Sequence, residues 1–264
     1  IQKGLDCVTA SGEVRAMPGV HTIEAGAYVN NSMVNWPNKP DITLKLTFEA
    51  DGTAGPATID VQGLGRAINV PNAVNLTIEG ITIKNGKASG DGGGIYLQSG
   101  ASLWLGQVIV DSCSTDGGGT VGGAVCSVGS NGYADKCIFI GNNCVANGGA
   151  IYGGNWKVNN CVFIGNSGWS YGIYASGGGF MTVVNSVFYA NTFAALPPSI
   201  GSDMNIANSI FWNNTTSLFS GSVQINYSDV QGGYPGTGNI NSDPLFVNTA
   251  GYDFNLLGGS SCID

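Results

Sequence analysis

Four carboxylates have the residue types that acid–base chemistry needs. Asp91 and Asp116 each stand shortly before a Gly-Gly pair, and Glu79 and Asp135 hold matching places in two repeated segments. A glycosidase uses two carboxyl groups roughly 5–10 Å apart, and Ca²⁺ also prefers oxygen ligands of this kind. Aspartate is common in glycine-rich turns for structural reasons alone. We therefore assign no catalytic residue, and we keep these four as candidates.

The cysteines are the second group that could do chemistry. Cys137 and Cys161 open two nearly identical stretches, CIFIGN and CVFIGN. A redox pair needs nearby positive charge to lower a thiol pKa, and the sequence offers little of it there. The chain has no CxxC, and its one histidine, His21, lies far from the cysteine-rich centre, so we expect no metal site. We expect Cys137 and Cys161 to pack as small apolar residues, with a disulfide as the alternative.

The stretch that begins at Cys137 belongs to a repeat, which must position all of these residues. The segment recurs as ITIKNG (81–86), VIVDSC (108–113), CIFIGN (137–142), CVFIGN (161–166), SVFYAN (186–191), SIFWNN (209–214) and, more faintly, SDVQGG (228–233). Two further short strands recur in the same frame, and glycine, 43 of 264 residues, supplies turns. This pattern predicts an all-β parallel β-helix of about 8–10 coils, each of roughly 19–30 residues and three short strands.

Stacked coils should bring like residues together about 4.8 Å apart, in continuous apolar columns. Three inward columns are expected: Ile83, Val110, Phe139, Phe163, Phe188, Phe211 and Val230; Ile78, Leu105, Ala134, Val158, Val183, Ile206 and Ile225; and Ile68, Ile95, Val125, Ile151 and Ile173. We predict one domain over 1–264. It would have an N-terminal cap and first coils at 1–65, regular coils at 66–233 and a closing segment at 234–264.

A column of asparagines ends the repeat: Asn142, Asn166, Asn191 and Asn214. A turn asparagine can adopt the left-handed conformation and hydrogen-bond the next asparagine in a stack. We interpret the column as a structural ladder. A polar strip that binds glycan is the alternative.

Beside the inward phenylalanines, strand alternation places an apolar strip on the outside of adjacent coils: Ile140, Ile164, Tyr189 and Trp212. This strip is the preferred candidate for a binding surface. It could contact a glycan, a second chain or a loop of the same chain. Six aromatic residues could also stack on sugar: Trp104, Trp156, Trp169, Trp212, Tyr171 and Tyr189. Of these, Trp156 is expected in or near the core.

Charge and composition exclude several classes of partner. Net charge is −8 with only nine Lys and Arg residues, too few to neutralise a run of phosphates, so nucleic acid is not an expected partner. No stretch approaches 18 uninterrupted apolar residues, so no transmembrane helix is expected. An acidic, weakly charged chain suits a secreted or surface-exposed protein.

Two motifs carry a family resemblance. Gly-Gly-x-Ile-Tyr at 148–152 and Phe-x-x-Asn resemble the repeats of chlamydial-type polymorphic outer membrane proteins, and the wider group of right-handed parallel β-helix proteins with a pectin-lyase-like fold. The ending SDPLFVNTAGYDFNLLGGSSCID (242–264) resembles that of secreted bacterial members. The resemblance implies a right-handed coil. It does not choose a function, because adhesins and polysaccharide lyases share this fold.

We therefore expect a non-enzymatic, extracellular or cell-surface β-helix that serves as a structural, adhesive or filament-forming module. Its partners would be other copies, through stacking of open ends, or surface glycans. The competing hypothesis is a carbohydrate-active enzyme, a polysaccharide lyase or glycoside hydrolase acting on acidic polysaccharide. No cofactor is expected, apart from a conceivable Ca²⁺ at the aspartates.

Overall fold

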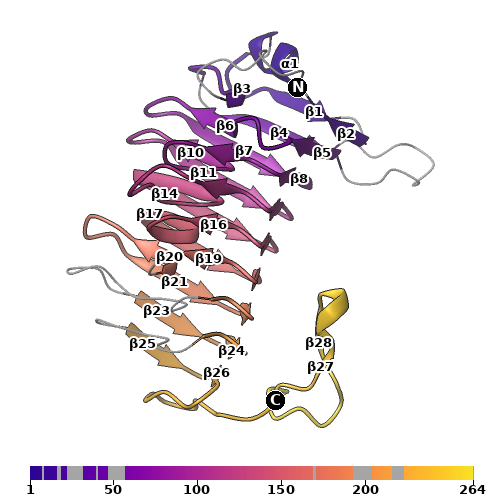
Figure 1. Ribbon diagram of the computed structural model, residues 1–264, viewed down its shortest axis with the longest axis vertical. Coiled ribbons are helices and arrows are strands. Elements are labelled where there is room, and N and C mark those ends of the chain that lie inside the picture. The colour runs from indigo at the N-terminus through magenta and orange to yellow at the C-terminus, as the bar shows by residue number, and fades with distance from the viewer. Residues whose placement is uncertain are drawn as a thin grey trace.

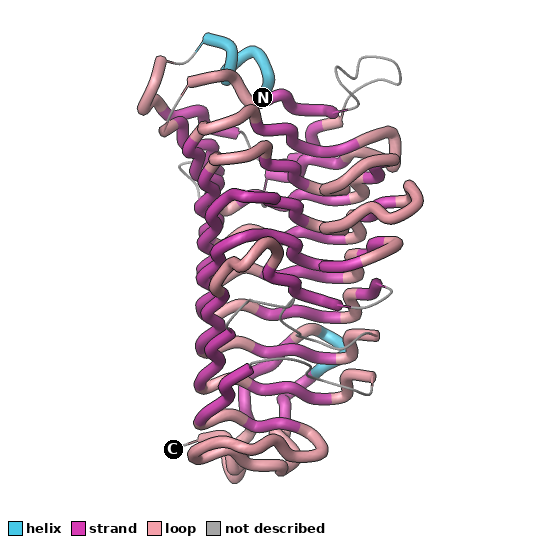
Figure 2. Tube along the Cα trace, turned by 90° about the vertical axis from the view of Figure 1, so that its left-hand side faces the viewer, coloured by secondary structure: helices cyan, strands magenta, loops and turns pink. Residues whose placement is uncertain are grey.

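The chain winds into a rod whose short strands lie across the long axis (Figure 1). The computed structural model describes residues 1–7, 9–16, 19–22, 32–39, 41–46, 57–168, 171–192, 204–215 and 223–263. Figure 2 shows the strands stacked coil upon coil along the rod. Every strand pair along the rod is parallel, and the predicted solenoid is confirmed; the antiparallel exception is a hairpin near the C-terminus.

Three sheets form the walls of the rod. The longest row of sheet A is β1 (Glu13–Ala16), β4 (Ile42–Leu46), β7 (Asn75–Glu79), β11 (Ser102–Gly106), β14 (Val125–Asp135), β17 (Asn147–Asn159), β21 (Met181–Val184), β23 (Met204–Ala207) and β25 (Val223–Asn226). Its other members are β3 (Ser32–Asn35), β6 (Arg66–Val70), β10 (Ile95–Leu97) and β20 (Tyr171–Ala175). The strands β14 and β17 pair both with strands of the long row and with these other members, because each runs around a corner of the coil.

Sheets B and C complete each coil. Sheet B contains β2 (Gly19–His21), β5 (Ala57–Asp60), β8 (Ile81–Lys84), β12 (Ile109–Asp111), β15 (Ile138–Ile140), β18 (Val162–Ile164), β22 (Val187–Tyr189), β24 (Ile210–Trp212) and β26 (Asp229–Val230). Sheet C contains β9 (Lys87–Ala88), β13 (Ser114–Thr115), β16 (Asn143–Cys144) and β19 (Ser167–Gly168). The nine strands of sheet B agree with the expected number of coils.

The predicted inward columns are the core. Register pairs join Phe139 to Phe163, Phe163 to Phe188 and Phe188 to Phe211, and all four rings are buried. Their ring centroids are 4.8, 4.5 and 4.7 Å apart with nearly parallel planes. This separation follows from the strand spacing, so the coil repeat itself sets the stack of rings.

The asparagine column forms a hydrogen-bonded ladder inside one corner of the rod. Nδ2 of Asn142 donates to Oδ1 of Asn166 at 2.9 Å, and the same bond links Asn166 to Asn191 and Asn191 to Asn214. One expectation is wrong: the asparagines are not themselves left-handed. The positive φ lies on the residue before each: Gly141, Gly165, Ala190 and Asn213. The asparagine side chain then satisfies backbone groups that this turn leaves unpaired.

The cysteine and serine column plays a similar capping role. The N–H of Cys137 donates to Sγ of Cys161, and the N–H of Cys161 donates to Oγ of Ser186. The pattern continues from Ser186 to Ser209 and from Ser209 to Ser228. All seven cysteines are free, so Cys137 and Cys161 form no disulfide in this structure. Sulfur and hydroxyl oxygen occupy the same place because either accepts the N–H of the preceding coil.

Both ends of the rod are closed by chain segments. At the N-terminus, α1 (Gln2–Cys7) is tied to β3 by two hydrogen bonds between Gln2 and Asn35. At the C-terminus, the N–H groups of Tyr227 and Val230 donate to the carbonyls of Thr237 and Ile240. The last coil is therefore not a free edge for stacking by another copy. None of the helices in the described ranges is long and apolar enough to cross a bilayer.

The chain then turns back along the outside of the rod as a hairpin (Figure 1). The hairpin consists of β27 (Phe246–Asn248), the 3₁₀ helix η1 (Thr249–Gly251) and β28 (Asp253–Leu256). Its strands run along the rod axis rather than across it. It stands beside the outer surface of sheet B, where Phe246 and Phe254 approach Tyr189 of the predicted apolar strip.

Candidate functional site

The outer face of sheet A carries a partly exposed pair of aromatic rings. Alternation along the strands points Thr77, Trp104 and Tyr133 outward, and the register places them side by side on β7, β11 and β14. The ring centroids of Trp104 and Tyr133 are 6.2 Å apart at an interplanar angle of 16°. On the other side of Trp104, Thr77 is too short to cover the indole. The Trp104 side chain is partly exposed to solvent.

Gly106 gives the Trp104 ring its position. A Cβ on Gly106 would overlap the six-membered ring of Trp104, so the indole lies over this glycine, two residues along its own strand. The backbone of Gly106 does not have the left-handed φ that only glycine tolerates well. Glycine is needed there for space rather than for conformation.

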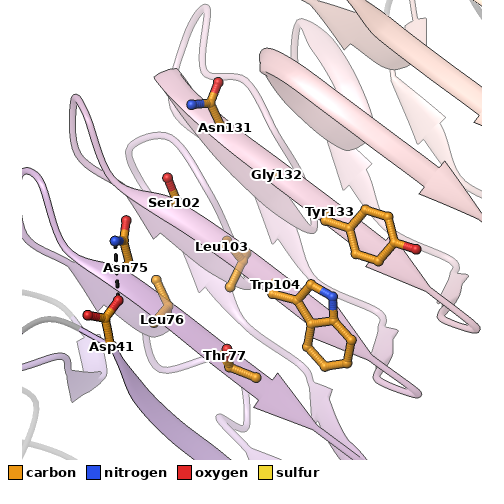
Figure 3. Close-up of a pocket in the computed structure, with 10 residues that line it drawn as sticks. All are labelled: Asp41, Asn75, Leu76, Thr77, Ser102, Leu103, Trp104, Asn131, Gly132 and Tyr133. Carbon is orange, nitrogen blue, oxygen red and sulfur yellow. Dashed lines mark hydrogen bonds between the residues drawn. The ribbon is translucent and has the colours of Figure 1, made fainter. Parts of the chain in front are cut away.

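A shallow depression of about 340 Å³ lies beside these rings (Figure 3). One side is the row of Thr77, Trp104 and Tyr133, which holds the two aromatic rings. The other side is a polar row with one residue per coil: Asp41, Asn75, Ser102 and Asn131. Nδ2 of Asn75 donates to Oδ1 of Asp41 at 3.2 Å, and the row continues to Asn155, whose Nδ2 donates to Oδ1 of Asn131 at 3.0 Å.

Two of the candidate carboxylates lie on this same face. Glu79 and Asp135 both pair in register with Gly106, from β7 and β14 on its two sides. Two strand spacings separate them, which is about 10 Å between backbones. Oδ1 of Asp135 accepts hydrogen bonds from Nδ2 of Asn159 at 2.8 Å and of Asn160 at 3.3 Å. The two carboxylates thus lie on opposite sides of the Trp104 ring. No hydrogen-bond partner in the described part of the chain is shared between them.

The other two candidates each contact a neighbouring coil. Oδ1 of Asp91 accepts the N–H of Val121 at 2.9 Å, whereas Asp116 forms an exposed ion pair with Lys87 at 3.2 Å. The N–H of Asp116 donates to Ala88, so its coil neighbour is not Asp91. These two aspartates are therefore not register neighbours, because loops of different length separate each from its Gly-Gly pair. Within the described ranges, no three His, Cys, Asp or Glu side chains gather as a metal site.

The predicted apolar strip is covered in part by the chain itself. Ile164 is buried, and Ile140, Tyr189 and Trp212 are partly exposed. The Tyr189 ring lies 6.0 Å from the ring of Phe246 and 5.3 Å from that of Phe254, both in the hairpin. The sequence left three partners possible for this strip: a glycan, a second chain or a loop of the same chain. At Tyr189 the structure shows the third.

The remaining aromatic candidates separate by environment. Trp156 is buried as expected; its Nε1 donates to Oγ of Ser127 at 2.7 Å, and Gly132 leaves room for its ring. Trp169 and the side chain of Tyr171 lie outside the described residues. The sequence reasoning missed Tyr133 and the polar row, although the inward place of Ala134 already implied that Tyr133 points outward.

Four of the five buried thiols are poor nucleophiles; the fifth, Cys137, has its pKa lowered by the hydrogen bond with Cys161, but it is fully buried. Burial raises the pKa of Cys113 and of Cys126 to about 12 and that of Cys144 to about 11. Burial also raises the pKa of Cys161 far above its usual range. A thiol that stays protonated at neutral pH is a poor nucleophile, so these residues act in packing and hydrogen bonding.

Comparisons with known proteins give the fold. Residues 57–193 match the family model of the right-handed beta helix region, which is more than half of the chain. Two solved structures of a PL6 family alginate lyase, AlyGC and a point mutant of it, are similar at 14% identity, with TM-scores of 0.43 and 0.39. They match over 92% and 90% of this chain but only 39% and 38% of their own length. No curated protein matches the chain. The resemblance to polymorphic outer membrane protein repeats stays a prediction.

Proposed function

We propose that this chain, which belongs to the right-handed β-helix family, is a non-catalytic adhesive module that binds polysaccharide on the outer face of sheet A. The observation that carries the proposal is the pair Trp104 and Tyr133, stacked on each other and partly exposed beside Thr77. An aromatic face attracts the C–H groups of a sugar ring, as it attracts other partly positive groups. A surface module of this kind would act outside the cell or on its surface.

The polar row beside the rings supports the same ligand. Asn75 and Asn131 are exposed, and an amide side chain both donates and accepts hydrogen bonds. Sugar hydroxyls also do both, so the row matches their chemistry. The strands of the rod hold these residues in place before binding, which lowers the entropy that a ligand must overcome.

Among the non-enzymatic roles, the structure favours adhesion over filament formation. The edge of β26 is already bonded to residues 237–240 of the same chain. End-to-end stacking of copies would have to displace this segment first.

Binding to a panel of insoluble polysaccharides tests the proposal. The chain should be pulled down by at least one polymer, and Trp104→Ala should lower that affinity about tenfold, in line with the loss of one aromatic contact. Tyr252→Ala is the matched control, because Tyr252 is 54% exposed on the hairpin, away from this face. Equal loss in both variants, or binding to no polymer, would overturn the proposal.

The second candidate is a carbohydrate-active enzyme acting on acidic polysaccharide. It is favoured by Glu79 and Asp135, which flank the Trp104 ring about two strand spacings apart, near the separation of an inverting pair. Release of reducing ends or unsaturated uronates from alginate or polygalacturonate would support it. Glu79→Gln and Asp135→Asn should then each abolish turnover, and such turnover would replace the adhesive proposal.

A further inference from the structure

We infer that the bound polysaccharide is a neutral chain that runs along the rod axis, across the strands, from Trp104 to a second aromatic contact at Phe180. The inference rests on the proposed function and deepens it. Phe180 is 43% exposed, whereas every other phenylalanine in the described part of the chain is buried or partly buried. It was not among the aromatic candidates that the sequence suggested.

Phe180 is placed at the end of the polar row. The row runs along successive coils as Ser102, Asn131 and Asn155, and β21 begins at Met181, in register with Trp156. Phe180 therefore stands opposite Asn155, and its N–H donates to Oδ1 of Asn155 at 2.8 Å. The exposed ring thus continues the row that borders the depression at Trp104.

The spacing favours a ligand that runs along the axis. From β11 to β21 there are three steps in the sheet, about 14 Å in all. A pyranose ring in an extended chain is about as long as one step, so each coil would meet one sugar. Asn131 and Asn155 supply one exposed amide at each step between the aromatic contacts. A ligand along a strand would leave these amides and Phe180 unused.

The charges of this face favour a neutral polymer. The strands β7, β11, β14 and β17 carry two carboxylates, Glu79 and Asp135, against one amine, Lys157. Asp41 adds a third carboxylate at the end of the polar row, and Lys45 of β4, in register with Glu79, adds a second amine, so carboxylates outnumber amines by three to two. A uronate chain would bring further negative charge to this face, where like charges repel. The whole chain is also acidic, at −8.

Titration calorimetry with oligosaccharides of two lengths tests the inference. The probes are the tri- and hexasaccharides of cellulose, xylan and mannan, with a hexagalacturonate as the acidic probe. We expect one neutral hexasaccharide to bind at least tenfold more tightly than its trisaccharide. Phe180→Ala should lower hexasaccharide affinity about tenfold and leave trisaccharide affinity unchanged, whereas Trp104→Ala should weaken both. Phe180→Tyr keeps the ring and should keep the affinity.

Failure of the inference is distinguishable from failure of the proposed function. Equal affinity of both lengths, or no effect of Phe180→Ala on the hexasaccharide, would overturn the path along the axis while polysaccharide binding stands. Preference for hexagalacturonate, with affinity that falls as salt rises, would overturn the neutral ligand. No binding of any probe or polymer would overturn both proposals. Circular dichroism checks that each variant is folded, and Tyr252→Ala is again the control.

Discussion

The outer faces of sheets A and B differ although the same repeat builds both. Sheet A presents polar residues and the Trp104–Tyr133 pair, with an open depression beside them. Sheet B presents two aliphatic rows, one through Ile138, Val162 and Val187 and one through Ile140 and Ile164. The hairpin stands over sheet B at Tyr189. An apolar outer row on a β-helix can thus indicate intramolecular cover, whereas the aromatic residues beside a polar row are where we propose that a ligand binds.

The hairpin and the strip depend on each other. A two-stranded hairpin is at best marginally stable alone in water. Here Phe246 and Phe254 pack edge to face at 5.0 Å and both approach Tyr189. The face of sheet B is therefore covered by the hairpin at Tyr189, and the face of sheet A is the one on which we propose binding. The predictions below test this contrast, in order of expected effect.

Breaking the interior should remove both faces together. In Asn166→Leu, the backbone N–H of Asn142 and the side chains of Asn142 and Asn191 each lose a buried hydrogen bond. We expect a loss of about 3 kcal/mol in the free energy of unfolding, because unpaired buried polar groups are costly. Urea denaturation measures it. Asn143→Ala is the control, since the bond of Asn143 to Ser167 is exposed, and it should change stability by less than about 0.5 kcal/mol.

Removing the contact between strip and hairpin should affect stability and not binding. Tyr189→Ala deletes the ring on which Phe246 and Phe254 pack. We expect about 1–2 kcal/mol of destabilisation. Relative to wild type, amide exchange should speed up more in 246–256 than in the coils. Trp104→Ala is the mirror variant, expected to reduce polysaccharide binding with little change in stability. If Tyr189→Ala lowered affinity as much as Trp104→Ala, the contrast between the faces would be wrong.

Displacing the indole without removing it should have a smaller effect. An alanine methyl at Gly106 would occupy the place of the Trp104 ring. We expect Gly106→Ala to weaken polysaccharide binding severalfold and to cost under about 1 kcal/mol in stability, because the indole can swing outward. Gly118→Ala is the control, since a Cβ there meets nothing within 4 Å and the position needs no left-handed φ. Unchanged affinity in Gly106→Ala would show that the ring position is unimportant.

Two aspartates of sheet B, Asp229 and Asp60, should contribute to stability with opposite pH dependence. Burial raises the pKa of Asp229, which accepts hydrogen bonds from the N–H of Ser242 and the thiol of Cys262. Its contribution to stability is therefore greatest below its unfolded pKa and is lost as pH rises through the folded value. Compared with wild type, Asp229→Asn should be relatively more stable at pH 7 than at pH 3, as thermal unfolding at both pH values would show.

Asp60 is the control with the opposite sign. Burial alone would raise its pKa, but hydrogen bonds from Asn85 and from the N–H of Gln62, with the charge of Lys84, lower it. Its contribution is present above its unfolded pKa of 3.8 and is lost as pH falls through the folded value. Asp60→Asn should therefore be relatively less stable at pH 7 than at pH 3. The same direction for both variants would contradict these assignments.

Repetition made much of the fold predictable. Phe139, Phe163, Phe188 and Phe211 recur in an unbroken frame, so their stacking follows from strand spacing alone. The sequence also indicated that Trp156 is inside and that Tyr189 is outside. It did not determine the neighbours of Asp91 and Asp116, where loops of unequal length break the frame and the hydrogen bonds show which residues lie opposite them.

The sequence by itself determined which side of each strand faces the core, because period-two alternation and a recurring coil leave one solution. Only the tertiary structure decided what happens outside. It placed a hairpin from residues 246–256 on Tyr189, set the Trp104 ring over Gly106, and brought Asn131, Asn155 and Phe180 into one row. Apart from the Trp104–Gly106 contact, which lies within one strand, those contacts join residues from different coils or from beyond the repeat, where no local pattern specifies the partner.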